Sequence, residues 1–152
     1  MSMSSLPATQ RRLISTITRS GQLRLQLETV PVPPPADNEV LIRVEAAPIN
    51  PSDLFLLTGP ADIATLRSEG DSENPVTVMD VPAPLLKTLS ARLDKPMPVG
   101  NEGAGVVVAA GKNAQGLLGK LVGVAAGDMF CQYRCAPASH CIVMNEGTTA
   151  QQ

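Results

Sequence analysis

The stretch PVGNEGAGVV, residues 98–107, decides how this chain folds. Its glycines are closely spaced, and they lead directly into Val106, Val107 and Val108, which favour a buried strand. A glycine loop that binds a dinucleotide follows a strand and opens a helix, because the helix N-terminus meets the pyrophosphate. Here the glycines precede a strand, with the reversed spacing G-x-x-G-x-G. The stretch therefore predicts tight backbone passage rather than a phosphate site.

Short segments on both sides of this stretch predict a mainly β chain. Val40, Ile42 and Val44 recur at every second position of residues 39–47, which is the period of a half-buried strand. Residues 30–35 are rich in proline and are expected to form an extended connector. Many short strands between Gly and Pro turns indicate a barrel or a sandwich. The same reasoning predicts further strands at residues 11–17, 23–28, 99–110, 119–124, 130–134 and 140–144.

Two parts of the chain depart from the strand pattern. Residues 1–10 are small and polar, and are expected to be a flexible N-terminal arm. Residues 58–96 predict short helices, with one or two turns at 60–66 and a polar loop at 70–74. Within 85–93, leucines fall at i, i+1, i+4 and i+8, which predicts an amphipathic helix that packs as a cap.

Composition excludes several classes of function. The chain has 152 residues, enough for one domain, and 43% of them are hydrophobic, as in globular proteins. Its aromatic residues are Phe55, Phe130 and Tyr133, too few for a platform that stacks nucleic-acid bases. A net charge of -2 with mixed signs provides no basic stripe for a phosphate backbone. We expect no nucleic-acid partner.

The apolar segments are too short for a membrane span, and residues 1–10 lack the hydrophobic core of an export signal. Three cysteines, Cys131, Cys135 and Cys141, cannot all pair within one chain. Free thiols fit a reducing compartment, so a cytoplasmic location without a membrane partner is expected.

Two motifs point to a family. AAPINPSDL at residues 46–54 and the glycine stretch at 98–107 stand in the order found in medium-chain dehydrogenases/reductases, and the strands around them keep that order. The chain resembles the zinc-free branch of this family, which contains quinone oxidoreductases, over residues 13 to 152. The resemblance implies an N-terminal, partly open β-barrel similar to GroES over residues 11–152, with 58–96 as an insertion. It also implies a Rossmann domain that binds NAD(P)H, which is expected to be missing from this chain.

The resemblance also bears on metals. Zinc-dependent alcohol dehydrogenases carry cysteine at the position of Asn50 and histidine at that of Asn101, and amides are poor zinc ligands. Glu102 alone cannot hold the metal. His140 with the three cysteines could be drawn as a site, but packed thiols are the favoured interpretation. We therefore expect no zinc and assign His140 no catalytic role.

Asn50 and Asp53 are the candidate catalytic residues implied by the resemblance. Asn50 matches an asparagine of quinone oxidoreductases that lies by the nicotinamide and the substrate, so it is also the candidate cofactor contact. Its alternative role is a turn residue before Pro51. Asp53 matches a family aspartate beside the same cleft, and its alternative role is the N-cap of a short helix.

Four further residues are expected to line the substrate cleft. Phe55 stands where family members often carry tyrosine, which removes a hydroxyl donor. Asn101 and Glu102 are expected to face the cleft or brace its wall. Tyr133 belongs to the strand that ends the catalytic face, with core packing as the alternative.

The resemblance implies the catalytic-domain portion of an enzyme that reduces a quinone or enone with NAD(P)H, through hydride transfer. Alone, the chain is expected to be inactive. A homo-oligomer is expected, because loss of a domain uncovers apolar surface. The alternative is a free-standing, non-enzymatic GroES-like module for binding or assembly.

Overall fold

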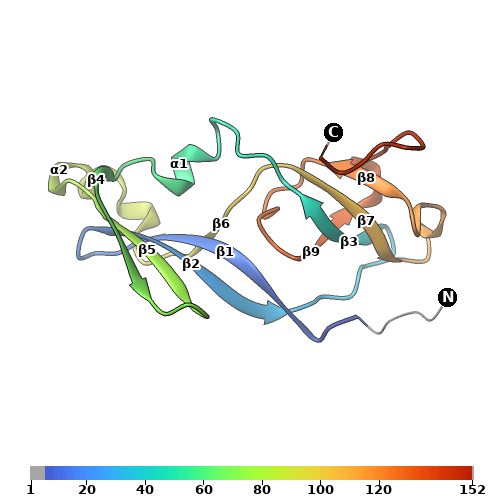
Figure 1. The fold of residues 1–152 in the computed structure, drawn as a ribbon, viewed down its shortest axis with the longest axis horizontal. Coiled ribbons are helices and arrows are strands. Elements are labelled where there is room, and N and C mark those ends of the chain that lie inside the picture. The colour runs from blue at the N-terminus through green and yellow to red at the C-terminus, as the bar shows by residue number, and fades with distance from the viewer. Residues whose placement is uncertain (1–5, 152) are drawn as a thin grey trace.

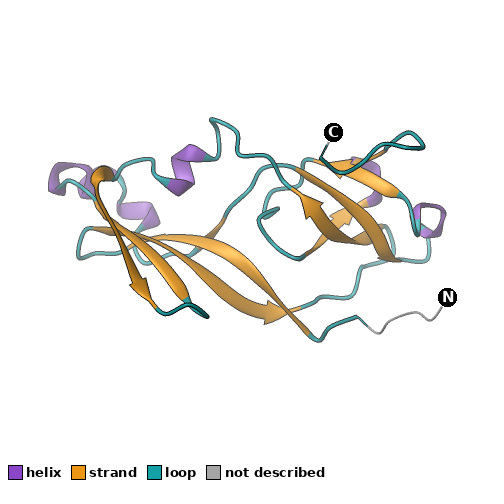
Figure 2. Cartoon of the chain, viewed as in Figure 1, coloured by secondary structure: helices purple, strands orange, loops and turns teal. Residues whose placement is uncertain are grey.

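The computed structural model describes residues 6–151, which form two antiparallel five-stranded sheets and a few short helices (Figure 2). The strands are β1 (Thr9–Ile17), β2 (Gln22–Pro31), β3 (Glu39–Ala46), β4 (Asp62–Gly70), β5 (Pro75–Asp80), β6 (Met97–Pro98), β7 (Gly103–Ala110), β8 (Leu121–Val124), β9 (Tyr133–Pro137) and β10 (Cys141–Val143). The helices are α1 (Leu54–Leu57) and α2 (Ala83–Thr88), with 3-10 turns η1 (Ser90–Arg92), η2 (Gln115–Leu117) and η3 (Ala138–His140). The prediction of a mainly β fold with short helices is confirmed.

The first sheet has the strand order β4-β5-β2-β1-β6. Its long hairpin of β1 and β2 pairs Leu13 with Leu27 and turns at Gly21, whose φ of 85° suits glycine. The buried core of this sheet is capped by leucines of α2 and the segment that follows it. The buried residues are Ile17, Leu23, Met79 and Val81, and Leu86, Leu89 and Leu93 pack against them.

The second sheet has the order β10-β8-β7-β3-β9. The alternation predicted for β3 is observed only in part, because Val40, Leu41 and Ile42 are all buried. Its core is formed by Val40, Ile42, Val107, Ala114, Val122, Val124, Met129 and Ala136.

The two sheets lie next to each other along the long axis in Figure 1, and the segment around Phe130 joins them. The N–H of Leu13 donates to the carbonyl of Phe130 at 2.8 Å, and the N–H of Phe130 donates to that of Val99 at 3.0 Å. Arg12 and Cys131 form an isolated bridge beside them. The two sheets thus remain separate ladders that meet at the segment around Phe130, as expected for a partly open barrel.

Several predicted boundaries are corrected. Thr9 and Gln10, assigned to a flexible arm, belong to β1, where they pair with Pro31 and Val30. Gln10 is buried, and its side-chain oxygen accepts from the N–H of Tyr133 at 2.8 Å. The same pairing makes Val30 and Pro31 the end of β2 rather than a connector. Residues 1–5 of the expected arm lie outside the described residues.

Two late strands are also shifted from their predicted positions. The strand expected at 130–134 is β9, which begins only at Tyr133, because residues 130–132 bond to β1: the N–H of Leu13 donates to the carbonyl of Phe130, and the N–H of Gln132 donates to that of Arg11. The strand expected at 140–144 is β10, which begins after η3.

The insertion at 58–96 is the largest correction. Most of residues 60–66, expected to be helical, belong to β4, which begins at Asp62 and pairs with β5. Because β5 in turn pairs with β2, the insertion extends the first sheet and is not only a helical cap. The amphipathic helix expected at 85–93 is split into α2 and η1. Among residues 6–151, helices are too short or too polar to cross a membrane.

Candidate functional site

The two motif loops meet at one end of the second sheet. β3 and β7 are antiparallel neighbours, with Ala46 opposite Ala104. The loop that leaves β3, residues 47–53, and the loop that enters β7, residues 99–102, therefore emerge together. Sequence-distant residues are brought side by side by this pairing.

Asp53 holds the two loops together. Its carboxylate is buried, with 1% of the residue exposed. One oxygen, Oδ2, accepts from the N–H of Asn50 at 2.8 Å, and the other, Oδ1, accepts from the N–H of Asn101 at 3.0 Å. Asp53 occupies the N-cap position of α1, but its side chain makes no capping bond there. Its carboxylate thus joins the loops instead of capping the helix.

Asn50 and Glu102 form the exposed polar pair of the site. The side-chain Nδ2 of Asn50 donates to Glu102 Oε1 at 2.6 Å. An amide nitrogen carries two donors, so this bond leaves one for a ligand. Next to the pair, Nδ2 of Asn101 donates to Ser52 Oγ at 2.9 Å. The structure thus unites Asn50, Asp53, Asn101 and Glu102; the sequence analysis missed the role of Ser52 although it lies inside the motif.

The glycines of residues 98–107 permit close backbone contact, as predicted. Gly100 has a φ of 94°, and a Cβ there would lie 2.6 Å from Cδ1 of Phe130. A Cβ on Gly105 would lie 2.0 Å from the carbonyl oxygen of Arg43. The segment enters a strand, β7, and offers no helix N-terminus to a pyrophosphate. These glycines do not fit a dinucleotide phosphate site.

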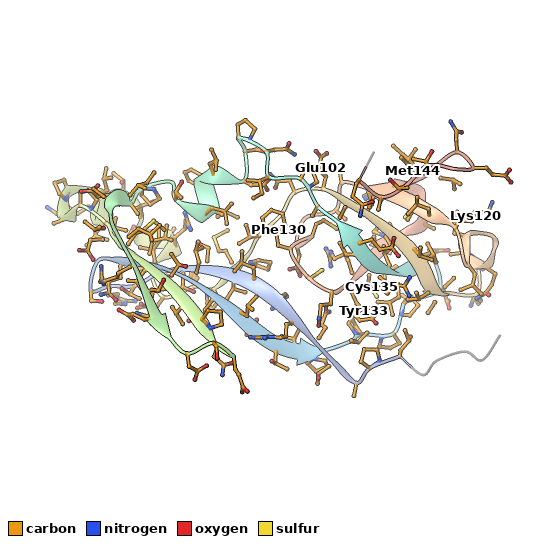
Figure 3. The ribbon with its side chains drawn as sticks, in the orientation of Figure 1. Glu102, Lys120, Phe130, Tyr133, Cys135 and Met144 are labelled. Atoms are coloured by element: carbon orange, nitrogen blue, oxygen red, sulfur yellow. The ribbon has the colours of Figure 1, made fainter. Side chains whose placement is uncertain are left out.

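The remaining predicted cleft residues lie apart from the polar pair. Phe55, on α1, is 59% exposed and faces the guanidinium of Arg92, 5.4 Å from the ring centroid. Tyr133 is half-buried on β9, which flanks β3 on the side opposite β7. Figure 3 shows Tyr133 beside Cys135 and away from Glu102. Arg92 had no signal in the sequence, because only the fold brings η1 against α1.

An open hollow of about 410 Å³ adjoins the polar pair. Glu102 forms part of its wall, and the rest is mostly apolar. Ile142, at its rim, is 71% exposed. The other lining residues include Pro48, Ala125, Met144 and Ala150. This is space in which an apolar group could lie against the site.

The thiols are arranged as separate packed groups. Cys131 Sγ donates to the carbonyl of Asp128 at 3.0 Å, and burial, aided by the Asp128 carboxylate, raises its pKa to about 12. Burial also raises the pKa of Cys135 and Cys141. Across residues 6–151, clusters of three or more His, Cys, Asp or Glu suited to a metal are absent. Asn50, Asn101 and Glu102 offer two amides and one carboxylate, a donor set that does not fit catalytic zinc.

Comparisons with known proteins place this arrangement in a family. The family described as the alcohol dehydrogenase GroES-like domain matches residues 36–151. Alcohol dehydrogenase 1 of Caenorhabditis elegans is 32% identical over 136 residues, which cover 90% of this chain and 29% of that protein. The chain thus spans less than a third of the length of this relative.

Two solved structures share the fold. The quinone oxidoreductase from Coxiella burnetii has a TM-score of 0.59 and 20% identity, covering 93% of this chain and 39% of that chain. Mycobacterial Rv1454c, solved in complex with NADPH, has a TM-score of 0.55 and 20% identity, covering 93% of this chain and 34% of that chain. The family match spans most of residues 6–151 and includes both motif loops. This protein therefore belongs to the alcohol dehydrogenase GroES-like domain family.

Proposed function

We propose that this chain is the catalytic-domain portion of a zinc-independent oxidoreductase that reduces a quinone or an enone with NAD(P)H. The observation that carries the proposal is the Asn50–Glu102 pair, whose Glu102 forms part of the wall of a mostly apolar hollow. Where zinc-dependent relatives place metal ligands, this chain places amides. The substrate carbonyl must then be polarised by hydrogen bonds.

The chemistry follows from where charge develops. NAD(P)H, bound largely by polypeptide outside this chain, would supply the hydride. When a conjugated carbonyl compound accepts a hydride, negative charge builds on its oxygen, and a fixed N–H donor stabilises that charge. Asn50 has one amide donor left after its bond to Glu102. Glu102 acts as a positioning residue, because its carboxylate fixes the rotation of the amide.

The proposal also covers the substrate, the location and the oligomeric state of the enzyme. Its substrate is a small quinone or enone, and its complete form is a cytoplasmic homo-oligomer. Asp53 acts through structure, by keeping the Asn50 loop against the Asn101 loop. Phe55 and Tyr133 stay proposed cleft residues; in this structure Phe55 contacts the guanidinium of Arg92, and the N–H of Tyr133 donates to Gln10 Oε1.

The test starts with the coding DNA beyond codon 152. An in-frame, glycine-rich βαβ segment supports the enzyme, and the whole product is then assayed for NADPH-dependent reduction of a quinone and an enone, with and without a chelator. Asn50→Ala is expected to lower kcat by about 10²–10³, as for loss of one oxyanion donor. The matched control is Asn113→Ala, which removes an exposed amide bonded to Asn38 at 2.8 Å.

Three outcomes would contradict the proposal. Equal losses in Asn50→Ala and Asn113→Ala would remove Asn50 from the reaction. Loss of turnover when the chelator is added would show that the reaction needs a metal ion. A reading frame that ends without such a segment would favour the free-standing binding module.

A further inference from the structure

Arg92 is the exception among the arginines of this chain. Each of the other seven has a carboxylate or carbonyl acceptor within reach of its side chain; the seven are Arg11, Arg12, Arg19, Arg24, Arg43, Arg67 and Arg134. All three guanidinium nitrogens of Arg92 are buried, and none finds a hydrogen-bond partner within residues 6–151. A guanidinium carries five N–H donors, and buried donors without acceptors are unfavourable.

The backbone around Arg92 is held firmly in this position. The N–H of Asp94 donates to the carbonyl of Ile17 at 2.8 Å, and Leu93 forms a bridge with Ile17 at the end of β1. Leu93 also packs against the core of the first sheet. Asp94, the nearest acid in sequence, is already bound by Arg19 at 2.6 Å. The backbone at Arg92 is therefore held in place, while none of the acids among residues 6–151 pairs with its side chain.

Phe55 is the cover of this buried cation. The guanidinium stacks over the Phe55 ring, and such a contact stabilises the charge but accepts none of the N–H bonds. Phe55 is 59% exposed and belongs to neither core cluster, so its ring can rotate into solvent without disturbing the core. Phe55 also lies two residues after Asp53, the residue that joins the loops of the polar pair.

We propose that Arg92 and Phe55 form a gated site that recognises an oxyanion, a carboxylate or a phosphate, carried by the substrate. The inference rests on the proposed function and narrows it to acidic unsaturated carbonyl compounds. When the Phe55 ring swings aside, the planar fork of Arg92 pairs with two oxygens of the anion at once. The bound oxyanion satisfies donors that the free protein leaves without acceptors.

The test is a titration of the 152-residue chain, labelled with ¹⁵N, with sodium acetate and separately with inorganic phosphate at constant ionic strength. The Arg92 Nε–Hε signal is expected to shift saturably at millimolar anion, while that of Arg19, already paired with Asp94, stays in place. The anion that saturates at the lower concentration identifies the carboxylate or the phosphate source. This readout needs neither cofactor nor turnover, so it stands apart from failure of the reductase proposal.

Variants separate recognition from general charge effects. Arg92→Gln is expected to abolish the saturable shifts of neighbouring amides, and Arg92→Lys to weaken them several-fold while keeping the charge. Arg19→Gln is the control and should bind as the parent does. Phe55→Ala should speed solvent exchange of the Arg92 Nε–H several-fold, because the ring is its cover.

Several results would overturn the inference. They are shifts that do not saturate, equal shifts at Arg19, binding that persists in Arg92→Gln, or unchanged exchange in Phe55→Ala. If Arg92→Gln does not fold, the parent titration and Arg92→Lys still decide the matter.

Discussion

At the scale of single residues, Asp53 explains why both motifs are needed. Among residues 6–151 it is the one buried carboxylate, and it uses a different oxygen for each loop. Each oxygen must remain an acceptor, since each faces a backbone N–H. An amide in its place turns one acceptor into a donor. The aspartate can thus be read as structural support for Asn50.

The corresponding prediction concerns Asp53→Asn. It should lower the free energy of unfolding by about 1–3 kcal/mol, because one buried N–H loses its acceptor. The control is Asp71→Asn: Asp71 also accepts two backbone N–H bonds, from Glu73 and Asn74, but through one oxygen, Oδ1, at an exposed turn. The control should cost less than about 0.5 kcal/mol. Urea unfolding measures both, and equal losses would contradict the assigned role.

The thiols carry a second prediction at this scale. The thiolate is the reactive form, and burial raises the pKa of Cys131 to about 12. Raised pKa values keep all three cysteines protonated at pH 8, Cys131 most of all. Alkylation followed by mass spectrometry should therefore modify Cys135 and Cys141 before Cys131. The Cys131 rate should keep rising with pH toward 12, and a Cys131 that reacts first would refute the assignment.

At the scale of elements, the insertion shows what a local pattern can and cannot predict. The leucine spacing identified the packed face in part: Leu86, Leu89 and Leu93 pack on the core, but Leu85 is 40% exposed. The same kind of reasoning failed at β4, which pairs with β5 across the turn at 71–74, while β5 in turn pairs with the distant strand β2. Arg67 lies opposite Val78 and forms an ion pair with Asp80 at 3.0 Å. The edge of β2 to which the β4–β5 hairpin adds is set by the tertiary fold and cannot be seen in the sequence of residues 60–66.

Adjacent leucines of α2 allow a matched test of this packing. Leu86 packs toward the turn at Gly21, where a Cβ would lie 3.5 Å from its Cδ1, whereas Leu85 is 40% exposed. Leu86→Ala should cost roughly 1–3 kcal/mol of unfolding free energy, below the range for fully buried leucines. Leu85→Ala should cost less than about 1 kcal/mol. The urea unfolding midpoints of the two variants, at unchanged m, measure this difference. A larger loss in Leu85→Ala than in Leu86→Ala would mean that the Leu85 face of α2 is the packed one.

At the scale of the whole molecule, strand patterns predicted the mainly β fold, and the two short motifs predicted which residues lie together. The loops at 46–54 and 98–107 meet because β3 pairs with β7, and bonds between residues far apart in sequence join them. The family resemblance carried by the two motifs already implied that Asn50, Asp53, Asn101 and Glu102 share one cleft. The positions of Tyr133 and Arg92 depend on strand order and on how the insertion docks. The residue spacing around Tyr133 or around Arg92 carries no information on strand order or on how the insertion docks. The candidate site was thus predictable near the motifs and not beyond them.

The glycine stretch leads to the last prediction, on cofactor binding by the 152-residue chain. The N–H of Asn101 is committed to Asp53, and the strand from Gly103 pairs with both β3 and β8. The stretch therefore lacks free amides arranged at a helix N-terminus for a pyrophosphate. Titration calorimetry of NADPH should give no saturable heat at millimolar cofactor in the Arg92→Gln variant, in which the proposed oxyanion site is absent. Heat that appears in the parent and vanishes in this variant would arise at Arg92. Heat that survives would locate a nucleotide site in the glycine stretch, and the assignment of cofactor binding to another domain would fail.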